Sequence, residues 1–163
     1  MMLNNIMVGI GGFAVSNSPG KIIKTMALGS CVGIVVYEPK LKVAGLLHVA
    51  LPESKIMPDK ARKLPGYFAD TGIKALLNEL RKYGINPQRS LKVKIAGGAN
   101  VMDAENVFSI GKRNILSVRK QLWQNRLSTN SEDIGGEISR TMWIEVDTGR
   151  VGLYSPRKGE WDI

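Results

Sequence analysis

The stretch VGIVVYEPKLKVAGLLHVAL, residues 32–51, decides the fold that the sequence predicts. Its first part, Val32–Tyr37, is apolar and rich in β-branched residues, which is typical of a buried strand. The polar segment Glu38–Lys42 predicts a turn, and Val43–Leu51 is a second apolar run that stops at Pro52. Because the loop between the two runs is short, we expect them to pair as an antiparallel hairpin.

The only cysteine and the only histidine of the chain lie at one end of this hairpin. Cys31 begins the first strand and His48 lies near the end of the second, so antiparallel pairing places their side chains close together. An ionised thiol is a strong nucleophile, and an imidazole can take its proton near neutral pH, so the pair indicates a nucleophilic site. The structural alternative is that the cysteine only packs in the core and the histidine is a satisfied core or surface residue.

Such a site also needs a group that orients the histidine and donors for an oxyanion. Thr25 and Asn100 are the candidate orienting residues. The backbone N–H groups from Ser30 to Val32 are the candidate oxyanion donors, and Asn100 is a further candidate for substrate binding. Both polar side chains have many structural uses, so the choice between them stays open at this point.

The glycines beside the thiol also have a place in this hypothesis. Gly29 and Gly33 flank Cys31 and leave room for a substrate chain to approach the backbone. One cysteine and one histidine supply too few ligands for a catalytic zinc, so no metal and no cofactor are expected. The chain has no phosphate-binding G-x-x-x-x-G-K-[ST] loop, and the glycines of 9–12 lack the context of a dinucleotide site.

The rest of the chain predicts an α+β fold in one domain over residues 1–163, with helices packed on a mainly antiparallel sheet. Amphipathic periodicity predicts helices over 69–80, ended by Gly84, and over 112–127. We expect a surface loop over 53–65 and a tail over 155–163 that frays or docks as a short segment. The further expected strands cover residues 8–15, 22–28, 91–96, 140–147 and 151–154.

Composition narrows the class of protein. The formal net charge is +9, but the basic residues are spread along the chain and no aromatic residues interleave with them. This pattern favours a solvated surface over specific nucleic-acid binding. No apolar run approaches the ~20 residues of a membrane span, and the first residues do not resemble a signal peptide. A single cysteine forms no internal disulfide, so we expect a cytoplasmic protein without membrane insertion.

Two blocks of the sequence carry a resemblance to a known family. TMALGSCVG, residues 25–33, and GLLHVALP, residues 45–52, resemble the chemoreceptor glutamine deamidases of chemotaxis, the CheD family. Further blocks follow in the order of the family and extend the resemblance over nearly the whole chain: Tyr67–Asp70, Lys94–Ala99, Ile110–Asn114, Asp133–Gly136, Arg140 and Val146–Gly149. One departure is Ser139, which precedes Arg140 where family members often have a glycine.

The resemblance implies a protein-glutamine glutaminase with Cys31, His48 and Thr25 as catalytic residues. It implies attack of the Cys31 thiolate on a receptor glutamine, release of ammonia, and hydrolysis of the thioester to glutamate. It also implies a layered α/β/β sandwich with two long helices, similar to the catalytic domains of deamidating toxins. The implied partners are the cytoplasmic domains of chemoreceptors and a CheC-type phosphatase. The alternative function is a non-catalytic adaptor that binds this phosphatase and the receptors.

Overall fold

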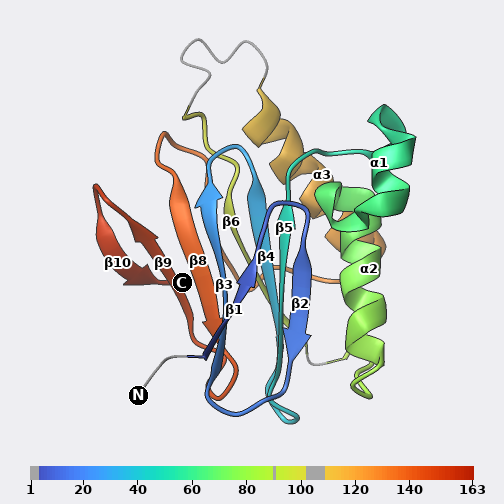
Figure 1. The fold of residues 1–163 in the computed structure, drawn as a ribbon, viewed down its shortest axis with the longest axis vertical. Helices are drawn as coiled ribbons and strands as arrows, with labels where there is room; N and C mark the ends of the chain where they lie inside the picture. Colours follow the sequence, from blue (N-terminus) through green and yellow to red (C-terminus); the bar gives the residue numbers. More distant parts are fainter. Residues whose placement is uncertain (1–3, 90, 102–108) are drawn as a thin grey trace.

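Two five-stranded sheets and the helices that pack against one of them make up the molecule (Figure 1). The computed structural model describes residues 4–89, 91–101 and 109–163. The strands are β1 (Asn4–Val8), β2 (Phe13–Ser16), β3 (Lys21–Leu28), β4 (Val32–Glu38), β5 (Val43–Val49), β6 (Lys92–Gly97), β7 (Ser131–Ile134), β8 (Arg140–Glu145), β9 (Val151–Ser155) and β10 (Gly159–Asp162). The helices are η1 (Ser54–Ile56), α1 (Pro58–Lys63), η2 (Pro65–Tyr67), α2 (Ala69–Arg81) and α3 (Ile110–Gln124).

The predicted hairpin is confirmed and forms the middle of one sheet. This sheet has the strand order β2-β5-β4-β6-β7, and the other has the order β1-β3-β8-β9-β10. Strands β4 and β5 pair antiparallel with Gly33 opposite His48, and every residue of both strands is buried. Burial on both faces explains why these strands are continuous apolar runs instead of alternating ones.

The three layers are helices, central sheet and outer sheet, and Figure 1 shows α1, α2 and α3 together on one side. Successive side chains of a strand point to opposite faces, so β4 and β5 contribute to two cores. The core between the helices and the central sheet contains Ile34, Leu47, Ile73, Leu77, Ile95 and Val118. The core between the two sheets contains Ile23, Val35, Leu46, Met142, Ile144 and Leu153. The α+β class is confirmed, whereas the resemblance to toxin domains stays a prediction.

The single strand predicted over residues 8–15 is wrong. The chain turns after β1, crosses from the outer sheet to the central sheet, and continues as β2. The glycines of 9–12 make this crossing possible: Gly11 has a φ of 77°, in the left-handed region, and the Gly12 N–H donates to the Gly9 carbonyl. The same turn pairs with β5, because the Gly11 N–H donates to the His48 carbonyl and the His48 N–H donates to the Gly12 carbonyl.

The surface loop predicted over residues 53–65 is also wrong, because it contains η1 and α1. Pro58 is the first residue of α1, where its missing N–H costs no helical hydrogen bond. The segment is fixed to α2 through Ser54, whose N–H and hydroxyl both donate to the Asp70 carboxylate at 2.9 and 2.6 Å. The two predicted long helices are confirmed as α2 and α3, although α3 begins at Ile110 and ends at Gln124.

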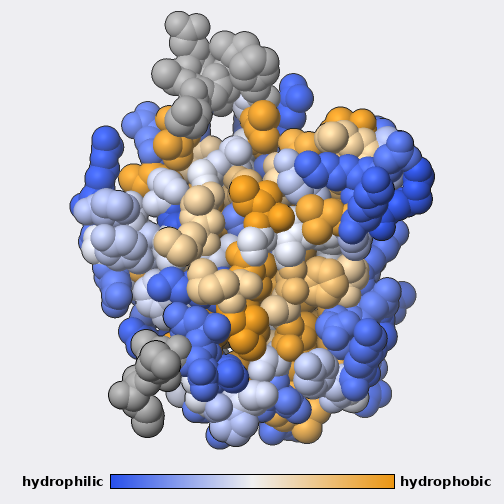
Figure 2. Space-filling model, viewed as in Figure 1, coloured by the Kyte–Doolittle hydropathy of each residue, from blue (hydrophilic) through white to orange (hydrophobic). Residues whose placement is uncertain are grey.

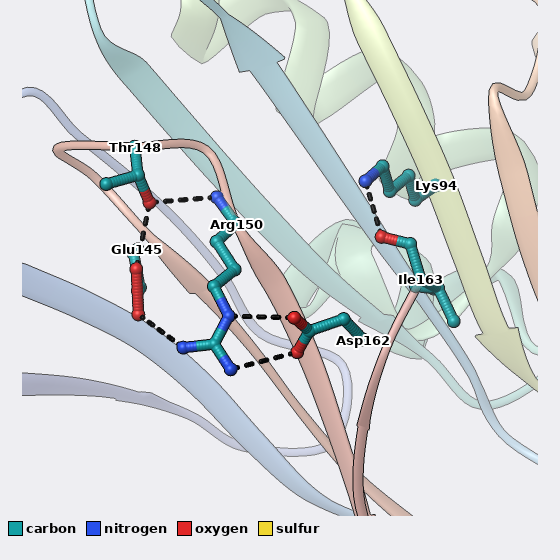
Figure 3. Close-up of polar contacts among 6 residues, drawn as sticks. All are labelled: Lys94, Glu145, Thr148, Arg150, Asp162 and Ile163. Atoms are coloured by element: carbon teal, nitrogen blue, oxygen red, sulfur yellow. Dashed lines mark hydrogen bonds and ion pairs between the residues drawn. The ribbon is translucent and has the colours of Figure 1, made fainter.

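The C-terminal tail docks as strand β10 beside β9, and β7 is a strand that the sequence did not predict. Figure 3 shows what fixes the tail. The Arg150 guanidinium donates to both carboxylate oxygens of Asp162, at 2.9 and 3.1 Å, and Lys94 Nζ donates to the Ile163 carbonyl at 2.5 Å. These polar contacts, together with Trp161 packing on the core between the sheets, hold a segment whose sequence looks like a solvated end.

An apolar area lies on the face of the molecule that Figure 2 shows. In Figure 2 apolar side chains gather over β1, β2 and β5 in the middle of the view, with hydrophilic side chains on both flanks. Among the described residues, no helix has both the length and the apolar character that crossing a membrane requires.

A glycine in the hairpin gives the first prediction. A Cβ added at Gly33 would lie 2.8 Å from Met142 Sδ and 3.0 Å from Leu28 Cδ1, in the core between the sheets. We expect Gly33→Ala to lower the free energy of unfolding by about 1–3 kcal/mol through overpacking. Chemical denaturation measures this loss. Gly9→Ala is the matched control, because a Cβ there meets nothing within 4 Å; equal losses in both variants would contradict the packing argument.

Candidate active site

The hairpin register places Cys31 and His48 on the same face of the central sheet. Gly33 lies directly opposite His48, and Cys31 is two residues before Gly33, so Cys31 is a diagonal neighbour of His48. Diagonal neighbours have Cα atoms about 7–8 Å apart, within reach of long side chains. This face points toward the outer sheet, where Cys31 packs, partly buried, against the core between the sheets. Gly33 faces Met142 and Leu28, so the room expected there for a substrate chain is occupied by the core.

Thr25 of β3 reaches His48 from the opposite sheet. Thr25 Oγ1 lies 2.6 Å from His48 Nδ1 and 2.7 Å from the Val8 carbonyl oxygen. A carbonyl oxygen only accepts hydrogen bonds, so the single hydroxyl proton of Thr25 goes to Val8. Nδ1 must therefore carry a proton and donate it to Thr25 Oγ1. This assigns the tautomer of His48 and leaves a lone pair on Nε2.

The Nε2 atom of His48 is buried and has no hydrogen-bond partner among the described residues. The thiol of Cys31 is therefore not hydrogen-bonded to it in this structure, and catalytic hydrogen bonds are often long before substrate binds. An unpartnered buried nitrogen is costly, and such atoms in native structures call for an explanation such as a catalytic role. The geometry leaves Nε2 available as a proton acceptor on the side of the sheet that also carries Cys31.

Burial shifts the pKa values of the two groups apart. Desolvation lowers the pKa of His48 from 6.5 to about 4, so the imidazole is neutral at neutral pH. Burial raises the pKa of the Cys31 thiol above 9.0, and the backbone N–H of Cys31 acts in the opposite direction. The pair is thus a neutral thiol and a neutral imidazole, so any attack by the Cys31 sulfur would require the thiol to give up its proton.

A bulge in β3 sets the direction of the chain between Thr25 and the thiol. The pairing of β3 with β8 shifts register between Thr25 and Leu28, and Ala27 has a φ of 61°. Thr25 and Leu28 are both fully buried while the two residues between them are exposed. The bulge therefore turns the chain out of the strand pattern just before the loop that carries Cys31.

Gly97, the last residue of β6, and Gly98 hold the backbone of the thiol loop. A Cβ at Gly97 would lie 2.2 Å from the Cys31 carbonyl oxygen, and the φ of Gly97 is 108°. The Gly98 N–H donates to the same carbonyl at 2.8 Å, and the Ala99 N–H donates to the Gly29 carbonyl at 2.7 Å. Only a residue without a side chain allows this approach, so the glycine pair fixes the position of the Cys31 backbone.

The remaining predicted residues lie around this loop and form no hydrogen bond with the His48 side chain among the described residues. Val32 is the first residue of β4 and is paired on both sides, with Val49 and Gly97. Ser30 and Asn100 line a hollow of about 720 Å³ beside the loop, together with Ala27 and Ser139. The Asn100 N–H donates to the Gly136 carbonyl. Of the two candidate orienting residues, the structure places Thr25, and not Asn100, against the imidazole.

One polar residue of the site was not predicted. Asn114 of α3 is fully buried, and its Nδ2 donates to the Ser30 carbonyl at 2.9 Å and to the Ala50 carbonyl at 3.0 Å. An asparagine on the buried face of an amphipathic helix is the signal that could have found it, because a buried amide requires partners. Among the described residues, no three histidine, cysteine, aspartate or glutamate side chains form a group that could hold a metal ion.

Comparison with known proteins shows the family of this chain. The family model described as "CheD chemotactic sensory transduction" matches residues 50–155. A Syntrophotalea carbinolica protein named "Probable chemoreceptor glutamine deamidase CheD" is 48% identical over 99% of this chain and 100% of its own length. The chain belongs to the CheD family. The resemblance of the sequence blocks is thereby confirmed.

Relatives in the CheD family come from distant organisms. The "Chemoreceptor glutamine deamidase CheD" of Thermotoga maritima is 39% identical over 94% of both chains. A Thermococcus kodakarensis protein with the name "Probable chemoreceptor glutamine deamidase CheD" is 37% identical over 95% of both chains. Among solved structures, a Neisseria meningitidis protein of the DUF152 family has a TM-score of 0.45 at 10% identity, over 82% of this chain and 63% of that one. So distant a likeness carries no argument about the site.

The buried imidazole predicts how stability depends on pH. His48 has a pKa of 6.5 when unfolded and about 4 when folded, so between these values only the unfolded chain binds the proton. Above pH 6.5 His48 is neutral in both states and does not lower the free energy of unfolding. As the pH falls from 6.5 toward 4, protonation of the unfolded chain lowers the free energy of unfolding by about 3 kcal/mol in total. Denaturation of the wild type and of His48→Gln across this window isolates the histidine, because the carboxylates titrate in both. Parallel pH curves for the two proteins would contradict the assignment.

Proposed function

We propose that the protein is a protein-glutamine deamidase that converts glutamine side chains of chemoreceptors to glutamate and releases ammonia. The names of its CheD relatives support this reaction and this class of substrate. The observation that carries the mechanism is the hydrogen bond between Thr25 and His48, which fixes the imidazole with Nε2 as the proton acceptor. Cys31, His48 and Thr25 are the catalytic residues of the proposal.

In the first step the Cys31 sulfur attacks the carboxamide carbon of the glutamine. The thiol proton passes to Nε2 of His48 as the sulfur–carbon bond forms, because the resting thiol is neutral. The C=O bond of the carboxamide becomes a C–O⁻ single bond in the tetrahedral intermediate. His48 then returns the proton to the nitrogen, the carbon–nitrogen bond breaks, and ammonia leaves a thioester.

In the second step a water molecule attacks the thioester carbon. Nε2 of the now neutral His48 takes a proton from the water, and the tetrahedral intermediate expels the Cys31 sulfur. The thiolate takes back the proton from His48, and the product is a glutamate side chain. Throughout, Nδ1 keeps its proton and donates a hydrogen bond to the Thr25 hydroxyl, which donates its own proton to the Val8 carbonyl. An imidazole held in one tautomer gives up and regains its proton at a single nitrogen.

The hollow beside the thiol loop is the proposed path of the substrate. Ser30, the residue before Cys31, lies on the wall of this hollow. Gly29 lies on the same wall, and a Cβ added there would have only Val101 within 4 Å, at 3.8 Å. Ser139, the departure from the family pattern, lies on this wall as well. A site open to a macromolecular substrate agrees with the partial exposure of Cys31. In this proposal the protein meets receptor cytoplasmic domains in the cytoplasm, and a CheC-type phosphatase is its predicted partner.

The reaction is tested by mass spectrometry of a receptor cytoplasmic fragment after incubation with the protein. We expect glutamine-containing peptides to gain the mass that separates an acid from an amide, with the wild type and not with Cys31→Ala. Ammonia release, measured in the same samples, is expected to match the number of converted side chains. Unchanged peptide masses with the wild type, beside a deamidase that converts the same fragment, would overturn the proposal. Conversion by Cys31→Ala would overturn the role of the thiol.

The role of Thr25 has its own test. Thr25→Val keeps the shape of the side chain and removes both hydrogen bonds of the hydroxyl. We expect kcat to fall by about 10²–10⁴-fold, because proton transfer then depends on an imidazole without a fixed tautomer. Thr25→Ser keeps the hydroxyl and is the matched control, with kcat expected within about tenfold of the wild type. Equal kcat values for the valine and serine variants would show that the hydroxyl has no catalytic role.

A further inference from the structure

We infer that Asn114 is a positioning residue that orients the backbone N–H of Cys31 as the oxyanion donor of the deamidation. The inference rests on the proposed function and goes beyond it by selecting one donor among the N–H groups from Ser30 to Val32. It also gives a role to the Ile110–Asn114 block, which the catalytic residues leave unexplained.

The contacts of Asn114 lead directly to the nucleophile. Both protons of its Nδ2 are used, one on the Ser30 carbonyl at 2.9 Å and one on the Ala50 carbonyl at 3.0 Å. Its amide therefore joins the residue before Cys31 to the second residue after His48. The two acceptors fix the orientation of the amide, because a flipped amide would direct its oxygen at two carbonyl oxygens.

Planarity of the peptide bond transmits this contact to Cys31. The Ser30 carbonyl and the Cys31 N–H belong to one trans peptide unit and point in opposite directions. With the carbonyl held against α3 by Asn114, the N–H points away from the helix layer. Among the described residues this N–H has no acceptor other than the sulfur of its own residue, whereas the Gly98 N–H donates to the Cys31 carbonyl. It faces the sulfur of its own residue, where it acts against the effect of burial on the thiol pKa.

An N–H beside the attacking sulfur is well placed for the charge that develops. When sulfur bonds to the carboxamide carbon, the negative oxygen is one bond from that carbon and needs a donor fixed in advance. The backbone N–H of the nucleophile itself fills this role in other hydrolases. The backbone N–H of Val32 is a weaker candidate for the oxyanion donor, because Val32 begins β4 and is paired there with both β5 and β6.

Close packing of glycines explains how an asparagine on α3 reaches this peptide. A Cβ at Gly111 would lie 2.5 Å from the Gly98 carbonyl oxygen, and a Cβ at Gly98 would lie 2.4 Å from Ile115. The first turn of α3 therefore rests directly on the glycine pair that holds the thiol loop. Asn114 Oδ1 remains buried without a partner among the described residues. The fold accepts this unpaired oxygen while both Nδ2 protons are used on the two strand ends.

The test compares Asn114→Ala with Ser117→Ala. Ser117 lies on the same helix and its hydroxyl donates to the Pro52 carbonyl at 2.7 Å, so its loss removes a similar contact away from Ser30. On a receptor fragment we expect Asn114→Ala to lower kcat by about 10–100-fold with little change in KM, and Ser117→Ala to stay within about twofold of the wild type. The pH midpoint of Cys31 alkylation by iodoacetamide should rise in Asn114→Ala only. Equal effects of the two variants, or an unchanged kcat in Asn114→Ala, would overturn the inference.

A measurement on the wild type removes the dependence on variant folding. A peptide whose glutamine side chain ends in an aldehyde adds the Cys31 thiol across its C=O bond, forming a sulfur–carbon bond and leaving the former carbonyl oxygen in the oxyanion position. We expect the ¹⁵N–¹H signal of Cys31 to show the largest downfield proton shift among Ser30, Cys31 and Val32. A larger response at Ser30 or Val32 would overturn the inference. Absence of any deamidation by the wild type would instead overturn the proposed function, and adduct formation would still report the donor.

Discussion

The hydrogen bond between Thr25 and His48 joins the two sheets at the end where the candidate site lies. It is a polar contact in a layer otherwise built from side chains such as Ile23, Leu46 and Met142. In such surroundings an unpaired hydroxyl or imidazole nitrogen is costly, so the two side chains depend on each other. The spacing and register of the two sheets must therefore agree with the length of this contact. The geometry of the candidate site therefore depends on how the two sheets stack.

Glycines set the rest of the site, and they do so through the absence of side chains. Gly33 leaves the space opposite His48 to Met142 and Leu28, while Gly97 lets the β6 backbone approach the carbonyl of Cys31. The contact of Gly98 with Gly111 then brings α3 down onto the same loop. The loop that carries Cys31 is thus held by backbone contacts from β6 and the residues that follow it. Desolvation then accounts for the raised pKa of the thiol and the lowered pKa of the imidazole.

The sequence was sufficient for the hairpin and for the proximity of Cys31 to His48, because both follow from two apolar runs and a short turn. It was insufficient for the crossing between sheets at 9–12, since alternating small and apolar residues fit one strand as well as two. The tail was expected to fray or dock, but its form as strand β10 was not predicted, because part of what holds it comes from Lys94, 69 residues before Ile163. The contact of Thr25 with His48 and the two bonds of Asn114 are also long-range, and they depend on how layers pack, which local periodicity does not encode.

The bulge at the end of β3 has a consequence for the length of the chain. Thr25 faces inward and is fixed to His48, while Cys31 must return to the same layer from the other sheet. Removing one residue between them would shorten the path by about 3.3 Å and would also reverse the side of the sheet on which the next residue emerges. Met26 and Ala27 are exposed and contribute little packing, yet deleting either would displace Thr25 relative to Cys31, whose distance from His48 is set by the pairing of β4 with β5. At these two positions the protein depends on the number of residues more than on their identity.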